Sequence, residues 1–248
     1  MSAGPVLRLD LEYDGAAFYG WAAQPGLRTV EGVLTEALRT FWPRSGRPAV
    51  AGRTDTGVHA SGQVVTVEAA EGGPELTRVP AALNAHLPPD VAVLGCTRAP
   101  EGFHARFSAR SRSYQYRVLR SRAPSPLRAA CTWHWPREIS QEVLGECAAL
   151  LLGEHDFRAF TPAETQHEVF RRIVLEAGWE REGDELVFRV EADSFLRHMV
   201  RTLVGTMIQT AGGERPPEAF ASLLEGSPRA AAGVTAPPHA LCLVGVRY

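Results

Sequence analysis

The spacing of apolar side chains changes several times along this 248-residue chain, and this change constrains the fold more than any other feature. From Leu7 to Tyr13 every second residue is apolar, which predicts a strand with one buried face. Over residues 30–41 the apolar residues follow helical spacing instead, and Thr29 stands at the N-cap position. A chain that carries both patterns must pack helices against a sheet.

The rest of the chain repeats this mixture. The clearest helix is predicted over residues 194–209, where apolar pairs recur every four residues and Asp193 can cap the first turn. The other patterns predict strands over 63–68, 91–97, 113–119, 170–179, 185–191 and 241–248, and helices over 77–85, 140–152 and 217–224. We therefore expect a mixed α+β fold with two lobes, residues 1–108 and residues 109–248.

The basic residues are unusual because all 26 of them are arginine. The absence of lysine excludes a Schiff-base lysine and a Walker lysine. Although the net charge is −2, residues 98–128 hold eight arginines and one acid, Glu101, which gives that stretch eight minus one, or +7. Guanidinium groups match phosphate geometry and stack on bases, so the stretch indicates RNA binding; the alternative is a solvated basic face without a partner.

Other features exclude several classes of protein. No apolar run approaches the ~20 residues that span a bilayer, and residues 1–11 lack a signal-peptide core, so we expect a cytoplasmic protein that does not enter a membrane. The histidines show no metal-ligand spacing. The four cysteines, at positions 96, 131, 147 and 242, are widely scattered and are predicted to be buried reduced thiols.

The segment Gly52-Arg53-Thr54-Asp55-Thr56-Gly57-Val58-His59 is the densest candidate for a catalytic site. Its glycines allow the backbone to approach a ligand closely. Arg53 favours the ionised form of Asp55, and an ionised carboxylate in a partly dry site can attack carbon. The alternative is a tight turn in which Asp55 binds its own backbone. The segment has no second acid for a typical glycosidase, and its glycines have the wrong spacing for a P-loop.

Further motifs follow in a fixed order along most of the chain. They are Tyr13-Asp14-Gly15-x-x-Phe18-x-Gly20-Trp21-x-x-Gln24, the Asp55 segment, Leu83-Asn84-Ala85-x-Leu87-Pro88, Phe103-His104-Ala105-Arg106-Phe107-Ser108-Ala109, Tyr114-x-Tyr116, His155-Asp156-Phe157, Phe195-Leu196-x-His198-Met199-Val200-Arg201 and Ala236-Pro237-Pro238-x-Ala240-Leu241. Each motif alone is weak, but together and in this order they resemble the TruA family of tRNA pseudouridine synthases. Pro238 and Ala240 depart from the family pattern.

The resemblance implies a pseudouridine synthase fold, with two lobes of mainly antiparallel sheet, helices on one face and an active-site cleft between the lobes. It implies an isomerase, an intramolecular transferase, that acts on uridines 38, 39 and 40 of the tRNA anticodon stem-loop. Asp55 would be the nucleophile, Arg201 would pair with it, Tyr114 would contact the flipped base, and Arg53 would enter the vacated stack. No metal or nucleotide cofactor is needed, and the family is homodimeric.

Two other functions stay open at this stage. A catalytically inactive tRNA-binding module would keep the basic stretch without the chemistry, although the intact Asp55, Tyr114 and Arg201 argue against it. A nucleoside N-glycosidase would use Asp55 with a second acid from elsewhere in the chain. Phe18 and Trp21 are predicted to be core residues and not base-stacking ones.

Overall fold

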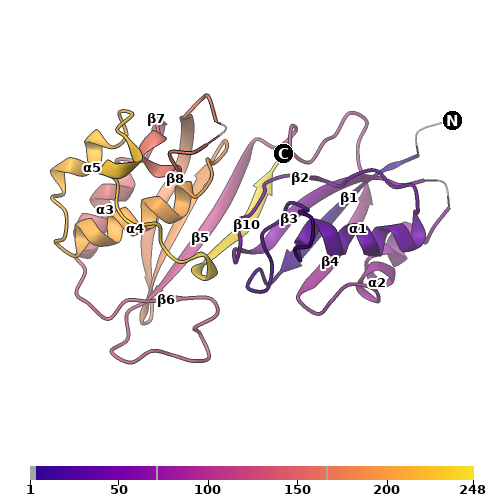
Figure 1. The fold of residues 1–248 in the computed structure, drawn as a ribbon, viewed down its shortest axis with the longest axis horizontal. Helices are drawn as coiled ribbons and strands as arrows, with labels where there is room; N and C mark the ends of the chain where they lie inside the picture. The colour runs from indigo at the N-terminus through magenta and orange to yellow at the C-terminus, as the bar shows by residue number, and fades with distance from the viewer. Residues whose placement is uncertain (1–3, 71, 166) are drawn as a thin grey trace. The chain divides into compact units, whose positions relative to one another are not determined.

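The computed structural model describes residues 4–70, 72–165 and 167–248, and these form two compact units. The first unit comprises residues up to Arg110 together with Leu243–Tyr248, and the second comprises Ser111–Cys242. In sequence, the second unit is thus inserted into the first. The yellow C-terminal strand β10 (Leu241–Arg247) brings the end of the chain back into the first unit (Figure 1).

The sheet of the first unit has the order β4-β1-β3-β10, with β2 paired to β3. Its strands β1 (Val6–Tyr13), β2 (Ala49–Val50), β3 (His59–Glu68) and β4 (Val91–Arg98) pair antiparallel. Side chains of β1 alternate as predicted, since Leu7, Leu9, Leu11 and Tyr13 are buried. One face of β1 therefore contributes to the core of this unit.

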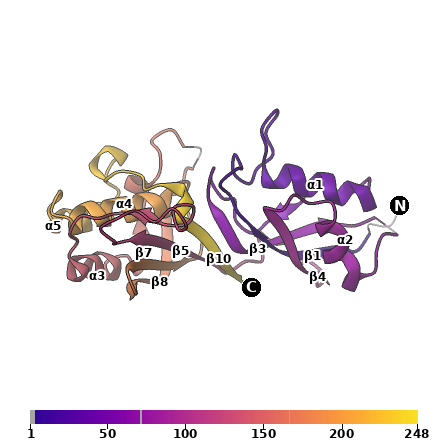
Figure 2. The ribbon, with the colours of Figure 1, turned by 90° about the horizontal axis from the view of Figure 1, so that it is seen from below.

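The helices of the first unit are α1 (Val30–Phe41) and α2 (Val79–Asn84), the latter preceded by a 3₁₀ turn at Leu76–Arg78. The predicted bounds of α1 are confirmed, and the Thr29 side chain accepts a hydrogen bond from the Gly32 N–H as an N-cap. Figure 2 shows α1 along one side of the sheet. Phe18 and Trp21 are both buried in the core, as predicted.

The sheet of the second unit has the order β5-β9-β8-β7 and is antiparallel along this path. The strands are β5 (Ser111–Leu119), β7 (Gly153–Asp156), β8 (Arg171–Glu182) and β9 (Glu185–Ala192), and the short β6 (Trp133–His134) pairs parallel to β5. A tight turn at Gly183, with φ 62°, joins β8 to β9. The sheets are thus mixed and mainly antiparallel, and the fold is α+β.

The helices of the second unit are α3 (Gln141–Ala149), α4 (Met199–Ala211) and α5 (Glu218–Ser222). Short 3₁₀ turns lie at Arg158–Phe160, Arg229–Ala231 and Pro238–Ala240. The prediction that Asp193 caps a helix beginning at residue 194 is wrong. His198 occupies the N-cap position of α4 with φ 61°, and the Asp193 carboxylate accepts hydrogen bonds from the backbone N–H groups of Ile173 and Ser194.

The cysteine prediction holds only in part. All four thiols are free, but only Cys147 is buried, while Cys131 is exposed and Cys96 and Cys242 are partly buried. Burial raises the pKa of Cys96 and of Cys147 to about 11, so both thiols stay protonated at neutral pH. Among the described residues, no helix is long and apolar enough to cross a membrane.

Candidate active site

Asp55 lies in the loop between β2 and β3 and is half-buried, while its neighbours differ in exposure. Arg53 is exposed and Thr54 is buried. The Thr54 hydroxyl lies 2.7 Å from the phenol oxygen of Tyr13, at hydrogen-bonding distance. The residue before Asp55 is thus fastened to the end of β1, which limits how far the carboxylate can move.

Gln63 on β3 is fully buried and binds the same loop. Its side-chain N–H₂ donates to the Gly52 carbonyl at 2.7 Å and to the Tyr13 phenol oxygen at 3.2 Å. Its carbonyl oxygen accepts the backbone N–H of Val64 at 3.2 Å. A buried amide with its groups satisfied fixes its neighbours in one arrangement. The one signal of this role in the sequence is a polar residue at the start of the predicted strand, directly before Val64 and Val65.

The segment around Gly20 clamps the backbone of the loop. Trp21 N–H donates to the Thr54 carbonyl at 3.0 Å, and Gly57 N–H donates to the Phe18 carbonyl at 3.2 Å. Gly20 has φ 82°, and a Cβ atom there would lie 2.9 Å from the Thr54 oxygen. Only glycine tolerates both the conformation and the close approach. The motif at residues 13–24 therefore supports the loop that carries Asp55.

A buried carboxylate supports this segment in turn. Glu31, in the first turn of α1, accepts the Ala23 N–H at 2.8 Å and forms an ion pair with Arg47. Burial raises the pKa of Glu31, but the Arg47 hydrogen bond, the Ala23 N–H and the charges of Arg47 and Arg53 outweigh it, so the pKa is lowered overall. Glu31 is thus ionised at neutral pH and lies within the electrostatic reach of Arg53.

Arg201 lies in the first turn of α4 and is tied to Ala236 at two points. The guanidinium Nε donates to the Ala236 carbonyl at 2.8 Å, and the Ala236 N–H donates to the Arg201 carbonyl at 3.1 Å. Tyr116 donates its hydroxyl proton to the adjacent Pro237 carbonyl at 2.9 Å. Burial raises the pKa of Tyr116 far above its ordinary value although the positive charge of Arg201 opposes the shift. Residues 236–237 therefore position Arg201, a role that sequence reasoning did not assign.

Tyr114 lies on β5 opposite Val190 of β9 and is 7% exposed. Its ring contacts Phe195 edge to face, with centroids 5.0 Å apart and planes at 84°. Phe195 lies in the segment before α4 that sequence patterning assigned to the helix. The aromatic contact holds the Tyr114 ring in a defined orientation.

The predicted site residues are divided between the two units. Arg53 and Asp55 share one loop of the first unit, whereas Tyr114 and Arg201 belong to the second. The pairing of Asp55 with Arg201 stays a prediction. Within residues 4–70, 72–165 and 167–248, no group of three or more His, Cys, Asp or Glu side chains is arranged to hold a metal ion.

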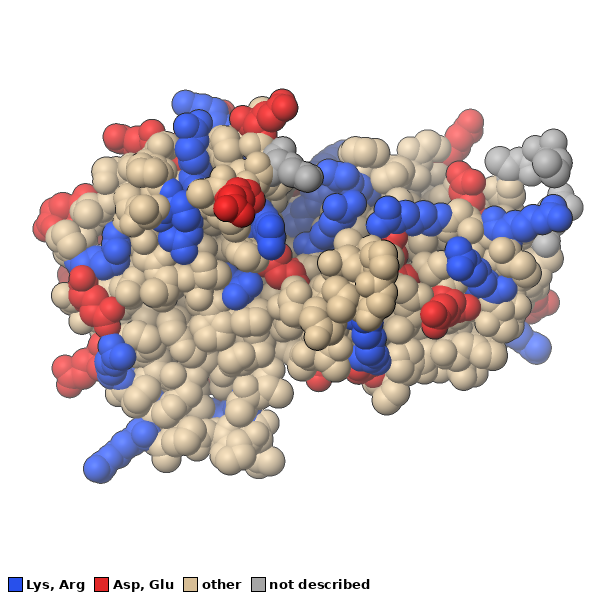
Figure 3. All heavy atoms as spheres, viewed as in Figure 1, with Lys and Arg blue, Asp and Glu red and all other residues tan. Residues whose placement is uncertain are grey.

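The basic stretch is partly neutralised by acids of the β8–β9 hairpin. Arg117 pairs with Glu182 and Glu185, with N–O distances of 3.0 and 2.8 Å. Arg128 pairs with Asp184, and Arg112 donates to the Asp193 carbonyl. The other arginines of the stretch are Arg98, Arg106, Arg110, Arg120 and Arg122. Figure 3 shows blue arginine side chains beside red acidic ones over the second unit, so the charge of +7 overstates the positive field there.

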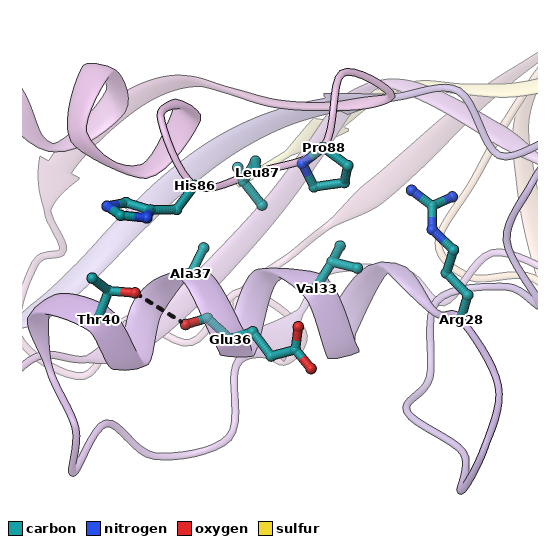
Figure 4. A pocket seen from close by; sticks show the side chains of 8 residues that line it. All are labelled: Arg28, Val33, Glu36, Ala37, Thr40, His86, Leu87 and Pro88. Carbon is teal, nitrogen blue, oxygen red and sulfur yellow. Dashed lines mark hydrogen bonds between the residues drawn. The ribbon is translucent and has the colours of Figure 1, made fainter.

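A groove of about 470 Å³ lies between α1 and the turn after α2 (Figure 4). It is lined by Arg28, Val33, Glu36, Ala37, Thr40, His86, Leu87 and Pro88. Arg28 is already engaged there, because its guanidinium binds both Asp90 oxygens, at 2.7 and 2.8 Å, and lies 4.0 Å from the ring centroid of Phe18. This groove contains none of the predicted site residues.

The sequence matches a family model described as tRNA pseudouridine synthase over residues 11–108 and 147–248. Together these segments hold the Asp55 loop, Arg201 and residues 236–237. The chain therefore belongs to the tRNA pseudouridine synthase family.

The individual relatives with high sequence identity share a more specific name. A protein of Halalkalibacterium halodurans named tRNA pseudouridine synthase A is 41% identical over 234 residues, which cover 94% of this chain and 89% of the relative. The protein of the same name from Frankia casuarinae is 43% identical over 246 residues, or 98% and 89% of the two chains. That from Moorella thermoacetica is 38% identical over 246 residues, or 98% and 100%. These alignments include Tyr114, which lies between the segments that the family model matches.

Proposed function

We propose that this protein isomerises uridine to pseudouridine at positions 38, 39 and 40 of the tRNA anticodon stem-loop, with Asp55 as the nucleophile. Membership of the tRNA pseudouridine synthase family makes it an isomerase that acts on tRNA. We propose further that it works as a cytoplasmic homodimer without a cofactor.

The observation that carries the proposal is the anchoring of the Asp55 loop. Tyr13, Gln63 and the backbone around Gly20 hold both sides of Asp55, while Asp55 itself is only partly buried. A nucleophile must be held close to its reacting geometry, because small displacements cost large factors in rate. A surface turn without a function would not need a buried glutamine and a closely packed glycine at positive φ to support it.

Arg201 and Tyr114 supply the remaining roles. Arg201, oriented by Ala236, would pair with Asp55 and direct its carboxylate at the substrate. Tyr114, held by Phe195, would contact the uracil after the nucleotide leaves its stack, which compensates part of the few kcal/mol that extrusion costs. Arg53 is exposed and would enter the space that the base vacates.

The reaction needs no external atoms. The bond between ribose C1′ and uracil N1 breaks, the base turns, and C1′ bonds to C5; the proton leaves C5 and N1 gains one. Attack by Asp55 on C1′ or on uracil C6 gives the same balance. The net reaction therefore needs no oxidant and no group donor.

The test is to incubate the protein, without cofactor, with unmodified tRNA that carries tritium at uracil C5. We expect tritium release by the wild-type protein and none by Asp55→Asn, which keeps the size of the side chain and should retain tRNA binding. Arg201→Ala should lower turnover far more than tRNA affinity. Equal losses of turnover and affinity would count against its pairing with Asp55.

The other outcomes identify the alternatives. Free uracil as the product would indicate an N-glycosidase, and tRNA binding without tritium release by the wild-type protein would indicate an inactive binding module. Mapping pseudouridine in the product tests positions 38, 39 and 40, and sedimentation of the free protein tests the dimer.

A further inference from the structure

Phe107 is the one exposed phenylalanine among the ten in the chain, all of which lie in described segments. Its side chain is 77% exposed, whereas Phe18, Phe157 and Phe188 are buried almost completely. Single exposed apolar residues are common, and Leu127 is 96% exposed. The surroundings of Phe107 distinguish it from such cases.

The backbone beneath Phe107 is held by a closed set of hydrogen bonds. His104 N–H donates to the Ser108 hydroxyl at 3.0 Å, and Ser108 N–H donates to the His104 carbonyl at 2.9 Å. The His104 Nδ1 atom accepts the N–H groups of Arg106 and Phe107, at 3.1 and 3.3 Å. This turn therefore fixes the direction in which the Phe107 side chain leaves the surface.

The turn is also fastened to the core of the first unit through Ala105, which is fully buried. Ala105 N–H donates to the Thr66 hydroxyl on β3 at 3.2 Å, and its carbonyl accepts the Tyr248 hydroxyl at 3.0 Å. The Tyr248 ring in turn packs on Phe103, with centroids 4.7 Å apart. An exposed aromatic ring on such a support loses little conformational entropy on binding.

The groups beside Phe107 suit a nucleotide. The His104 ring lies 4.5 Å from the Phe107 ring at an angle of 32°, and the Arg106 guanidinium carbon lies 5.5 Å from its centroid. Because Nδ1 of His104 accepts two N–H groups, a neutral imidazole carries its proton on Nε2, as a donor. Residues 98–110 hold three arginines and Glu101, a net charge of +2.

We propose that Phe107, flanked by His104 and Arg106, is a stacking platform for an unpaired base of the RNA substrate. This inference rests on the proposed function, since it assigns part of the tRNA contact. Proteins bind unpaired nucleotides by pairing an aromatic face for the base with cations for the adjacent phosphates. A protein partner would favour a wider apolar patch, whereas the exposed neighbours of Phe107 include Arg106 and Arg110.

The experiment measures the Kd of an unmodified tRNA transcript for Asp55→Asn protein, in which no turnover occurs. We expect Phe107→Ala to weaken binding by about 5- to 140-fold, which corresponds to ~1–3 kcal/mol for stacking on one base. Phe107→Trp should restore most of the affinity because an indole also stacks. Leu127→Ala, which removes a more exposed apolar side chain, serves as the control and should bind like the parent protein.

Salt dependence separates stacking from charge. Phe107→Ala should leave the slope of log Kd against log salt unchanged, whereas Arg106→Ala should reduce its magnitude by roughly 0.7–0.9. Unchanged tRNA affinity in Phe107→Ala would overturn the proposal. So would a change in the sedimentation of the free protein, which would assign Phe107 to a contact between copies of this chain.

The tritium assay distinguishes a failure of this proposal from a failure of the proposed activity. If the wild-type protein releases no tritium while Phe107→Ala still weakens tRNA binding, the platform stands and the proposed reaction fails. If tritium is released normally and Phe107→Ala binds tRNA like the parent protein, the reaction stands and the platform fails.

Discussion

Replacing Arg47 with methionine should destabilise the first unit, because it leaves the buried carboxylate of Glu31 without its ion-pair partner. Arg47 forms an ion pair with Glu31, whose side chain is 3% exposed, while that of Arg47 is 64% exposed. The substitution keeps a long apolar stem and removes only the charged head. Glu31 then stays buried with the Ala23 N–H and the more distant charge of Arg53 as its remaining support.

The expected loss in the free energy of unfolding depends on how much of the ion pair is buried. Removing one partner from a fully buried pair costs ~3–5 kcal/mol, because the other charge is left uncompensated. Arg47 is largely solvated and Arg53 still lowers the pKa of Glu31, so we expect a loss of ~1–3 kcal/mol at pH 7. Urea unfolding measures this loss, and hydrogen exchange at residues 20–34 reports where it acts.

The loss should shrink as the pH falls. In the wild-type protein the pKa of Glu31 is lowered from 4.5, so its contribution is present above pH 4.5 and is lost as the pH falls through the folded-state value. Without Arg47 the largest remaining influence is burial, which raises the pKa, so the variant gains relative stability when Glu31 is protonated. The difference between the two proteins is therefore larger at pH 7 than near pH 4.

A second variant, Glu31→Gln, tests whether Arg47 acts through the charge of Glu31. Glu31→Gln keeps an oxygen acceptor for the Ala23 N–H but carries no charge, so adding Arg47→Met to it should cost less than about 0.5 kcal/mol. An equal cost in both backgrounds, or the same cost at pH 7 and pH 4, would show that Arg47 acts through packing and not through the charge of Glu31.

Two further predictions concern the supports of the site. Gly20→Ala and Gly26→Ala both place a side chain at positive φ, 82° and 73°, but only the Cβ at position 20 approaches the Thr54 oxygen, at 2.9 Å. Gly20→Ala should lower kcat by about tenfold or more, with Gly26→Ala near wild type; equal effects would exclude pressure on the Asp55 loop. Tyr116→Phe should cost ~1 kcal/mol in urea unfolding, because it leaves the Pro237 carbonyl without its donor. No loss would show that water replaces the hydroxyl.

The sequence predicted local structure well wherever a residue's neighbours in the chain decide its conformation. Helix α1 has the predicted bounds because Thr29 caps it and its apolar stripe runs its whole length. Helix α4 begins later than predicted, although Phe195 and Leu196 continue the apolar spacing. Leu196 is buried and Phe195 packs against Tyr114, both from a non-helical segment, and the helix begins only after His198, which has φ 61°. Periodicity reports burial, and burial does not require a helix.

The supports of the candidate site depend on contacts between distant residues, which one sequence does not reveal. The motif around Asp55 identified the loop, but its anchor Gln63 follows only from the pairing of β3 with β1. The Ala236 carbonyl that orients Arg201 lies 35 positions along the chain from it. The positive charge of residues 98–128 was overestimated, because the acids that neutralise part of it lie far along the chain, in the β8–β9 hairpin at residues 182–185.

The return of residues 243–248 to the first unit has a consequence for biosynthesis. These residues are translated after the whole of the inserted unit, yet β10 pairs with β3, a strand translated early. Until they emerge, the nascent chain presents one edge of β3 without its neighbour, and open strand edges recruit other chains. The inserted unit is translated between the two segments of the first unit. The first unit is therefore begun earlier but completed later than the second, and its unpaired strand edge is the part of the nascent chain that chaperones would have to protect.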